Sequence, residues 1–239
     1  MRGCRAKVPR FATLVAFVAL TAVSFAASQA CAAQVLSVDE GSFSLVKAGE
    51  RLGREDFSIR SAPSAAGPIF VAQATILLGG RRIRPGLNAD TSGAVLRYQN
   101  EVRVDGLVQE SYSGQVTRDH YAARTQRGDG ESLREFRLPA GTVVVDDQVC
   151  HQLWFVARRG AGAEVRVLAP QRNVVETIAV ELVGTETLAI DVQEFTVQHL
   201  RLRTMETGVT RDVWLDARGR VLKVAVPAEQ LVALREDVR

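Results

Sequence analysis

The sequence predicts a mainly β protein, an all-β sandwich or barrel that is either open or closed, with one amphipathic helix. Three observations support this prediction. Short segments in which apolar and polar residues alternate recur along the chain, and turn-forming residues separate them at short intervals. Valine, threonine and isoleucine are common after residue 164. Only one segment, in mid-chain, has the periodicity of a helix.

The first 32 residues have the three-part order of a secretory signal peptide. Four basic residues precede an apolar run over 11–27, and the small-residue stretch SQACAAQ follows. We expect cleavage after Ala32 or Ala33, which leaves residues 33–239 as a single β-rich domain in the periplasm. A lipid-modified Cys31 is the less favoured alternative, because Ser28 and Gln29 stand where a lipoprotein signal has Leu and a small residue. No transmembrane helix is expected after removal of the signal.

Removal of this segment changes the charge balance. Lys and Arg fall from 30 to 26 against 27 Asp and Glu, so the net charge of the remaining chain is −1 rather than +3. A nucleic-acid-binding domain needs a basic excess, so nucleic acid is excluded as a partner. Cys150 is the only cysteine left, and an intrachain disulfide is therefore impossible.

Residues 94–104 form the clearest predicted strand. Leu96, Tyr98, Val102 and Val104 fall on one face, where Asn100 is the only polar residue. A turn at Asp105-Gly106 follows, and the next strand puts its apolar residues Val108, Tyr112 and Val116 on one parity. To align the two apolar faces, we expect a three-residue loop, 105–107, because a slip of one residue would turn one face to water.

The other predicted strands follow the same reasoning. They lie within residues 42–60, 73–86, 132–138, 163–170, 173–184, 186–206 and 211–227. In the last of these segments, Asp216 and Gly219 fit the first and fourth positions of a type I turn, which we favour over a catalytic role. Trp214 lies opposite Leu222 if the connection has three residues, and on the other face if the number is even.

Residues 146–160, DDQVCHQLWFVARRG, predict the helix. Asp146 or Asp147 can cap its first N–H groups and Gly160 can end it. Phe155 falls on the polar side, which is an exception to the pattern. The apolar face is formed by Val149, Cys150, Leu153, Trp154, Val156 and Ala157.

The sequence lacks the residue patterns on which most classes of enzyme depend. His120, His151 and His199 do not have the spacing of metal ligands, and the nucleotide-binding and acyl-transfer motifs are missing, so we expect no metal, no cofactor and no enzymatic activity. Cys150-His151 is the one dipeptide with a catalytic appearance. Neighbouring residues on a helix point about 100° apart, so a buried structural thiol is favoured.

Several motifs resemble those of uncharacterised exported bacterial β-rich proteins. They are FSLVKAGERLG over 43–53, VDDQ over 145–148, LAP over 168–170, VWLDARGRVLKVAVP over 213–227 and ALRED over 233–237. That group is similar to the lipoprotein-carrier type of half-barrel. The resemblance implies a strongly curved antiparallel sheet with the helix packed on its concave side. It also implies a lipid or another hydrophobic ligand in the concavity.

The resulting functional hypothesis is a non-enzymatic envelope protein that binds a lipid or another hydrophobic ligand on the concave face. The candidate ligand-binding residues are Tyr98, Tyr112, Cys150, Leu153 and Trp154. The alternative is a structural or protein-interaction module of the cell envelope whose core is filled by side chains, with an envelope protein as partner.

Overall fold

The computed structural model describes residues 34–118 and 120–237, which belong to one compact unit, Ala33–Arg239. This unit is mainly β, with one large, curved and unclosed sheet of 15 strands and a single short α-helix among the described residues. The predicted fold class is therefore confirmed. The predicted signal peptide lies outside the described residues and stays a prediction.

The sheet contains two successive runs of strands. The first run comprises β1 (Leu36–Lys47), β2 (Glu50–Ala62), β3 (Ile69–Leu78), β4 (Arg81–Asp90), β5 (Val95–Val104), β6 (Leu107–Thr117), β7 (His120–Arg127) and β8 (Gly130–Arg137). The second comprises β9 (Val143–Val144), α1 (Leu153–Ala157), β10 (Glu164–Ala169), β11 (Val174–Ile190), β12 (Gln193–Thr204), β13 (Thr210–Asp216), β14 (Val221–Val226), the 3-10 turn η1 (Pro227–Glu229) and β15 (Leu231–Arg235).

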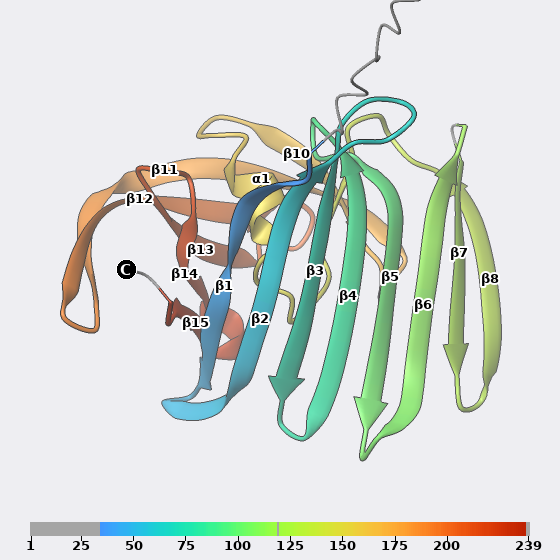
Figure 1. The fold of residues 1–239 in the computed structure, drawn as a ribbon, viewed down its shortest axis with the longest axis horizontal. Helices are drawn as coiled ribbons and strands as arrows, with labels where there is room; N and C mark the ends of the chain where they lie inside the picture. The colour runs from blue at the N-terminus through green and yellow to red at the C-terminus, as the bar shows by residue number, and fades with distance from the viewer. Residues whose placement is uncertain (1–33, 119, 238–239) are drawn as a thin grey trace, which may run out of the picture. The chain divides into compact units, whose positions relative to one another are not determined.

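The two runs join where the chain returns to its start. Strands β1 to β8 form a meander, and β15 pairs with the free side of β1, so the strand order runs from β8 through β1 and β15 to β9. Every pairing is antiparallel except that of β9 with β10. Figure 1 shows β1–β8 side by side, with α1 behind them.

The sheet is curved so strongly that one of its edge strands, β9, approaches the inner face of the first run. The backbone N–H of Val95, at the start of β5, donates to the carbonyl of Thr142, just before β9, at 2.9 Å. The edge strand β9 thus lies beside β5 rather than beside the other edge strand, β8. Because β6 to β8 continue past this point, the sheet does not close into a barrel.

In strand β5, most residues of the predicted apolar face are buried, and one is exposed. Tyr98, Asn100 and Val102 are buried on the inner face, as predicted. Leu96 is exposed instead, because it is the extra residue of a β-bulge: Asn88 of β4 pairs with Arg97, and Ala89 pairs with Val95. The parity of a strand predicts its faces only between bulges.

The connection from β5 to β6 also differs from the prediction. Val104 pairs directly with Leu107, so the turn holds two residues, and Asp105 and Gly106 both have positive φ. The apolar faces are aligned by a β-bulge opposite Val102 and Arg103 rather than by a third loop residue. Val108 is exposed as a result, and Tyr112 is buried.

The helix is shorter and more deeply buried than predicted. It spans only Leu153–Ala157 and has no side-chain cap, so the capping role predicted for Asp146 or Asp147 is wrong. Phe155, assigned to the polar side, is fully buried, as are His151 and Gln152 just before the helix. Because β-strands enclose this segment on several sides, its polar side chains are buried as well.

The turn between β13 and β14 follows the prediction. The N–H of Gly219 donates to the carbonyl of Asp216 at 2.9 Å, and Gly219 has a φ of 74°. The Asp216 carboxylate accepts the N–H groups of Arg218 and Arg220, each at 2.9 Å. Asp216 therefore stabilises a three-residue connection.

Trp214 lies outside the main core. A β-bulge at Leu222 pairs Trp214 with Lys223, and Trp214 packs with Leu222 in a second, smaller hydrophobic cluster. Trp214 therefore lies on the same face as Leu222 but not directly opposite it, where the three-residue alternative places it. The ring of His199 stacks on Trp214 with centroids 4.3 Å apart, and Nζ of Lys223 lies 4.3 Å from the ring centroid.

Candidate functional site

The five residues predicted to bind a ligand all lie in the main hydrophobic core, and all are buried. The rings of Tyr98 on β5 and Tyr112 on β6 are in contact, with centroids 5.8 Å apart. Trp154 of α1 packs edge-on against Phe70 of β3 and against Phe155. Both groups of aromatic side chains therefore belong to the packed core.

Little space is left beside the helix. The cavity that Cys150 and Leu153 line has a volume of about 20 Å³. A single water molecule needs about 10–15 Å³ by the same kind of measure. This part of the concave side is therefore filled by protein and has no room for an acyl chain.

Hydrogen bonds to Asp146 join the segment before α1 to the sheet. The buried carboxylate accepts the Tyr98 hydroxyl at 2.6 Å and the Asn100 amide at 2.9 Å, while the Asp146 N–H donates to Gln152 at 2.7 Å. Burial raises the pKa of Asp146 to about 6, although the hydrogen bonds from Tyr98 and Asn100 oppose this shift. Burial, reinforced by Asp146, also raises the pKa of Tyr98 well above its ordinary value.

A second buried carboxylate, Glu55 of β2, binds the turn at Cys150 and His151. It accepts their backbone N–H groups at 2.8 and 2.9 Å, and its Oε1 lies 2.6 Å from Nδ1 of His151. The His151 ring also stacks on Phe57. The sequence analysis missed Glu55, because its partners follow about a hundred positions later; the only signal was a carboxylate on the apolar parity of β2.

These contacts argue against a catalytic Cys150. Its thiol is buried and its pKa is raised by that burial, whereas a nucleophilic cysteine needs a lowered pKa and access to substrate. His151 directs its Nδ1 to Glu55 rather than to the thiol. Residues 34–118 and 120–237 also contain no group of three or more His, Cys, Asp or Glu placed to hold a metal ion.

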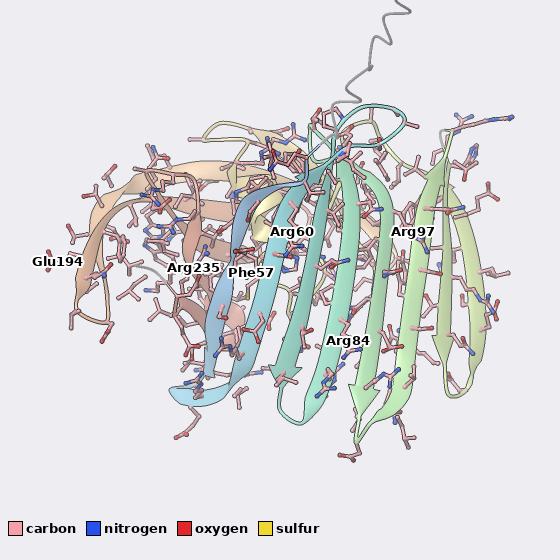
Figure 2. All side chains as sticks on the ribbon, viewed as in Figure 1. Phe57, Arg60, Arg84, Arg97, Glu194 and Arg235 are labelled. Carbon is pink, nitrogen blue, oxygen red and sulfur yellow. The ribbon has the colours of Figure 1, made fainter. Side chains whose placement is uncertain are left out.

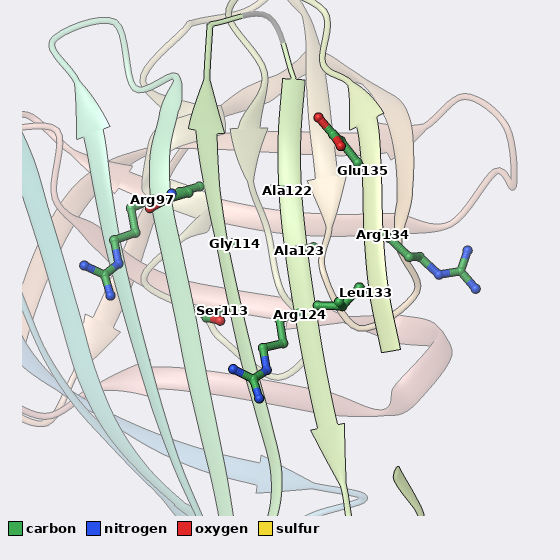
Figure 3. A pocket seen from close by; sticks show the side chains of 10 residues that line it. Arg97, Ser113, Gly114, Ala122, Ala123, Arg124, Leu133, Arg134 and Glu135 are labelled. Atoms are coloured by element: carbon green, nitrogen blue, oxygen red, sulfur yellow. The ribbon is translucent and has the colours of Figure 1, made fainter. Parts of the chain in front are cut away.

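The outer face of β1–β8, turned away from α1, is open by contrast. One hollow of about 580 Å³ lies over β1–β5 and includes Ser58, Arg60, Arg84 and Gln99 in its wall. Another of about 560 Å³ lies over β5–β8. Figure 3 shows Arg97, Ser113, Arg124 and Leu133 around this second hollow. We call this region, from Arg60 on β2 to Arg124 on β7, the outer trough.

The outer trough carries cations without ion-pair partners. Among the described residues, neither Arg84 nor Arg97 forms an ion pair, although Glu101 pairs with Arg84 across the strands and its pKa is lowered by a hydrogen bond from Arg103 and by the charge of Arg84. Their neighbours differ: Arg103 bonds Glu101 at 2.7 Å, and Arg124 bonds Glu131 at 2.5 Å. Figure 2 shows Arg60, Arg84 and Arg97 on the near face of the strands, with α1 and most of the second run behind.

Small residues form the floor of the trough. Gly86 pairs with Gln99, and Gln99 pairs with Ser113 on the next strand, so this row of side chains crosses the middle of the sheet. The Gln99 side chain folds over Gly86, where an added Cβ would meet it at 3.3 Å. The hydrogen-bonding groups that this row offers on the outer face are therefore the side chains of Gln99 and Ser113.

Comparison with known proteins gives structural similarity alone. No family model and no curated protein matches the chain. A beta-barrel-like protein of the DUF1849 family from Brucella abortus matches with a TM-score of 0.49 and 11% identity, covering 86% of this chain and 97% of that one. A DUF1089 family protein from Pseudomonas aeruginosa gives 0.34 and 17%, covering 77% and 89%.

Both TM-scores are too low to carry an inference about function. Neither structure is described as a lipoprotein carrier, so that resemblance stays a prediction. No helix in the described part of the chain is both long and apolar enough to cross a membrane.

Proposed function

We propose that the protein is a non-enzymatic interaction module of the bacterial envelope, and that it binds a partner protein in the outer trough. The proposal rests on the difference in volume between the cavity beside α1 and the hollows of the outer trough. The cavity beside α1 measures about 20 Å³, whereas the hollows of the outer trough measure about 560 and 580 Å³. A molecule can bind in the trough without displacing a buried side chain.

The arginines indicate the chemistry of the partner. A guanidinium group that is not hydrogen-bonded to a carboxylate of its own chain remains available for two parallel hydrogen bonds to a carboxylate of a partner. Arg84 and Arg97 lie on the same face on adjacent strands, on either side of the row that holds Gln99. Strand geometry separates their Cα atoms by about 14 Å. A partner segment with acidic residues spaced along it fits this arrangement.

Location in the envelope is part of the same proposal and rests on the order of charged, apolar and small residues in 1–32. Expression of the full-length gene, fractionation of the cells and mass determination of the recovered chain test it. A periplasmic chain that begins at Ala33 or Gln34 is expected. Recovery of the intact chain from the cytoplasm would contradict the location but not the binding surface.

Site-specific photocrosslinking in cells tests the binding surface. A photoreactive residue at Gln99 or Ser113 should give one defined protein adduct, and the Arg84→Glu/Arg97→Glu variant should abolish it. The matched control is the same probe at Val192, which is 89% exposed on the far hairpin of β11 and β12. No adduct at Gln99 or Ser113, or equal adducts at all three positions, would overturn the proposal.

The hydrophobic-ligand hypothesis is tested on the same material. A lipid between the sheet and α1 would have to displace side chains such as Tyr98 and Trp154 from the core. Native mass spectrometry of protein purified from the envelope should therefore show the mass of the polypeptide alone. A stoichiometric lipid that survives purification would favour the concave-face site over the outer trough.

A further inference from the structure

The turns at one end of the first run carry apolar side chains that face solvent. Figure 1 shows the turns joining β1 to β2, β3 to β4 and β5 to β6 at the same end of the sheet. Near these turns Leu107 is 68% exposed, Val108 50%, Leu77 45% and Leu52 39%. Exposed apolar residues that occur singly need no explanation, but a group of them marks a contact site.

The pairing of the strands places these residues together. Leu77 pairs with Arg82, Arg82 with Arg103, and Arg103 with Val108, so four neighbouring strands contribute to one row on the outer face. The carbonyl of Leu52 accepts the N–H of Gly79 at 3.2 Å, which fixes β2 against the turn between β3 and β4. Leu107 pairs with Val104 and so belongs to the other face of the sheet. We name Leu52, Leu77, Arg82 and Val108 the hairpin-end patch.

A hollow of about 410 Å³ lies within this region. Its wall combines Leu52, Leu77 and Leu78 with the turn glycines and with Arg81, Arg82 and Arg103; Asp105 is the only acid. Across the part of the chain that the structure describes, no carboxylate pairs with Arg82, and Arg81 has only a 3.5 Å hydrogen bond to Gln148. Arg103 is paired with Glu101, so Arg81 and Arg82 supply the positive charge of this otherwise apolar region.

We propose that the hairpin-end patch docks the protein on an anionic lipid bilayer. Apolar side chains at the tips of turns can enter the boundary between headgroups and acyl chains without unfolding the sheet. Arginines beside them are attracted by anionic headgroups, each by an amount that corresponds to about a fivefold change in binding. The patch is small, so the protein docks reversibly and in a fixed orientation.

This proposal is independent of the outer trough. Its residues lie at the end of the sheet, and the bilayer requires neither Arg84 nor Arg97. Docking at this end leaves the middle of the outer face and the edge strand β8 accessible to a partner. The two proposals can therefore fail separately.

Sedimentation with lipid vesicles tests the docking surface. The protein is expressed from its full-length gene and purified in the form that the cell yields, and its first residue is determined by mass spectrometry. It should sediment with vesicles of phosphatidylglycerol and phosphatidylcholine, but not with vesicles of phosphatidylcholine alone. Added salt should weaken binding, because the headgroup attraction is screened.

Matched variants assign the binding to the patch. Val108→Ser and Arg82→Gln should each weaken binding by about fivefold. Their controls are Leu133→Ser and Arg134→Gln on β8, where Leu133 is 72% exposed, and these should bind as the unaltered protein does. Circular dichroism and thermal melting check that all four variants fold.

Three results would overturn the proposal. The first is no sedimentation with either kind of vesicle. The second is equal weakening in the patch variants and their controls, which would show that binding does not depend on this end of the sheet. The third is a dimer in solution that Val108→Ser dissociates while vesicle binding is absent, since the patch would then be a contact between two copies of the chain.

Discussion

The carboxylate of Glu55 on β2 accepts the backbone N–H of His151 at 2.9 Å and lies 2.6 Å from Nδ1 of the same residue. Both side chains are fully buried. The interaction joins the second strand to the segment before α1, 96 positions later. A carboxylate in this place stabilises the turn that leads into the helix, because it also accepts the N–H of Cys150.

Removal of this carboxylate should destabilise the whole unit. Glu55→Ala leaves the N–H groups of Cys150 and His151 buried without an acceptor, at an expected cost of about 2–5 kcal/mol of unfolding free energy. Glu55→Gln keeps one acceptor oxygen and should cost less. Urea denaturation measures both, with the exposed Glu135→Gln as the control. Equal stability of Glu55→Ala and the unaltered protein would contradict this role.

Breaking the buried pair of Asp39 and Arg235 should lower the free energy of unfolding by a similar amount. Arg235 on β15 donates to the Asp39 carboxylate at 2.8 and 3.0 Å, and thereby holds β1 to the last strand. Asp39→Ala leaves a buried guanidinium with only Asp237 as its acidic partner, so we expect a loss of about 3–5 kcal/mol. Breaking the exposed pair of Arg51 and Glu236 should cost less than about 1 kcal/mol. Similar losses in both cases, measured by urea denaturation, would contradict this reasoning.

The fold class could be predicted because alternation is a local property. The strand around Tyr98 and the turn at Asp216 depend on neighbours within a few positions, and the structure has both as expected except at Leu96. The β-bulges at Leu96 and Leu222 could not be predicted. A bulge depends on how adjacent strands pair, which the periodicity of one strand does not reveal.

The helix shows a second limit of prediction. Its periodicity assigned Gln152 and Phe155 to a solvent-facing side, which assumes that water covers one face of a helix. The sheet encloses α1, and Gln152 is buried with its Oε1 accepting the Asp146 N–H. The outer trough could not be predicted, because its residues look like ordinary solvent-facing residues in the sequence. Outward-facing arginines such as Arg97 are normal on a strand, and only the structure shows which of them have no ion-pair partner.

The raised pKa of Asp146 predicts a dependence of stability on pH. Its pKa is about 6 in the folded protein against an ordinary value of 3.8, so the unfolded chain ionises first as the pH rises. The stability contributed by the protonated group is present below about pH 4 and is lost by about pH 6, a change of about 3 kcal/mol. Asp146→Asn should lack this loss, because it carries no charge.

The comparison of the two proteins isolates this effect. The stability of Asp146→Asn relative to the unaltered protein, from urea denaturation, should rise between about pH 4 and about pH 6 and then remain constant. The variant can keep hydrogen bonds to β5, since Oδ1 of Asn100 has no partner in the described structure and can accept from the new amide after rotation. A difference that does not change with pH would contradict the raised pKa.

The thiol of Cys150 should react only when the protein unfolds. Burial raises its pKa, so thiolate is scarce at neutral pH, and the enclosing side chains exclude reagent. Titration with a chromogenic disulfide should show no free thiol in the native protein and one per chain in denaturant, once the N-terminus is known to lie beyond Cys31. Cys150→Ala is the control and should give no signal in either state. Rapid reaction of the native protein would mean that α1 leaves the sheet readily, and a hydrophobic ligand on the concave face would then become the stronger hypothesis.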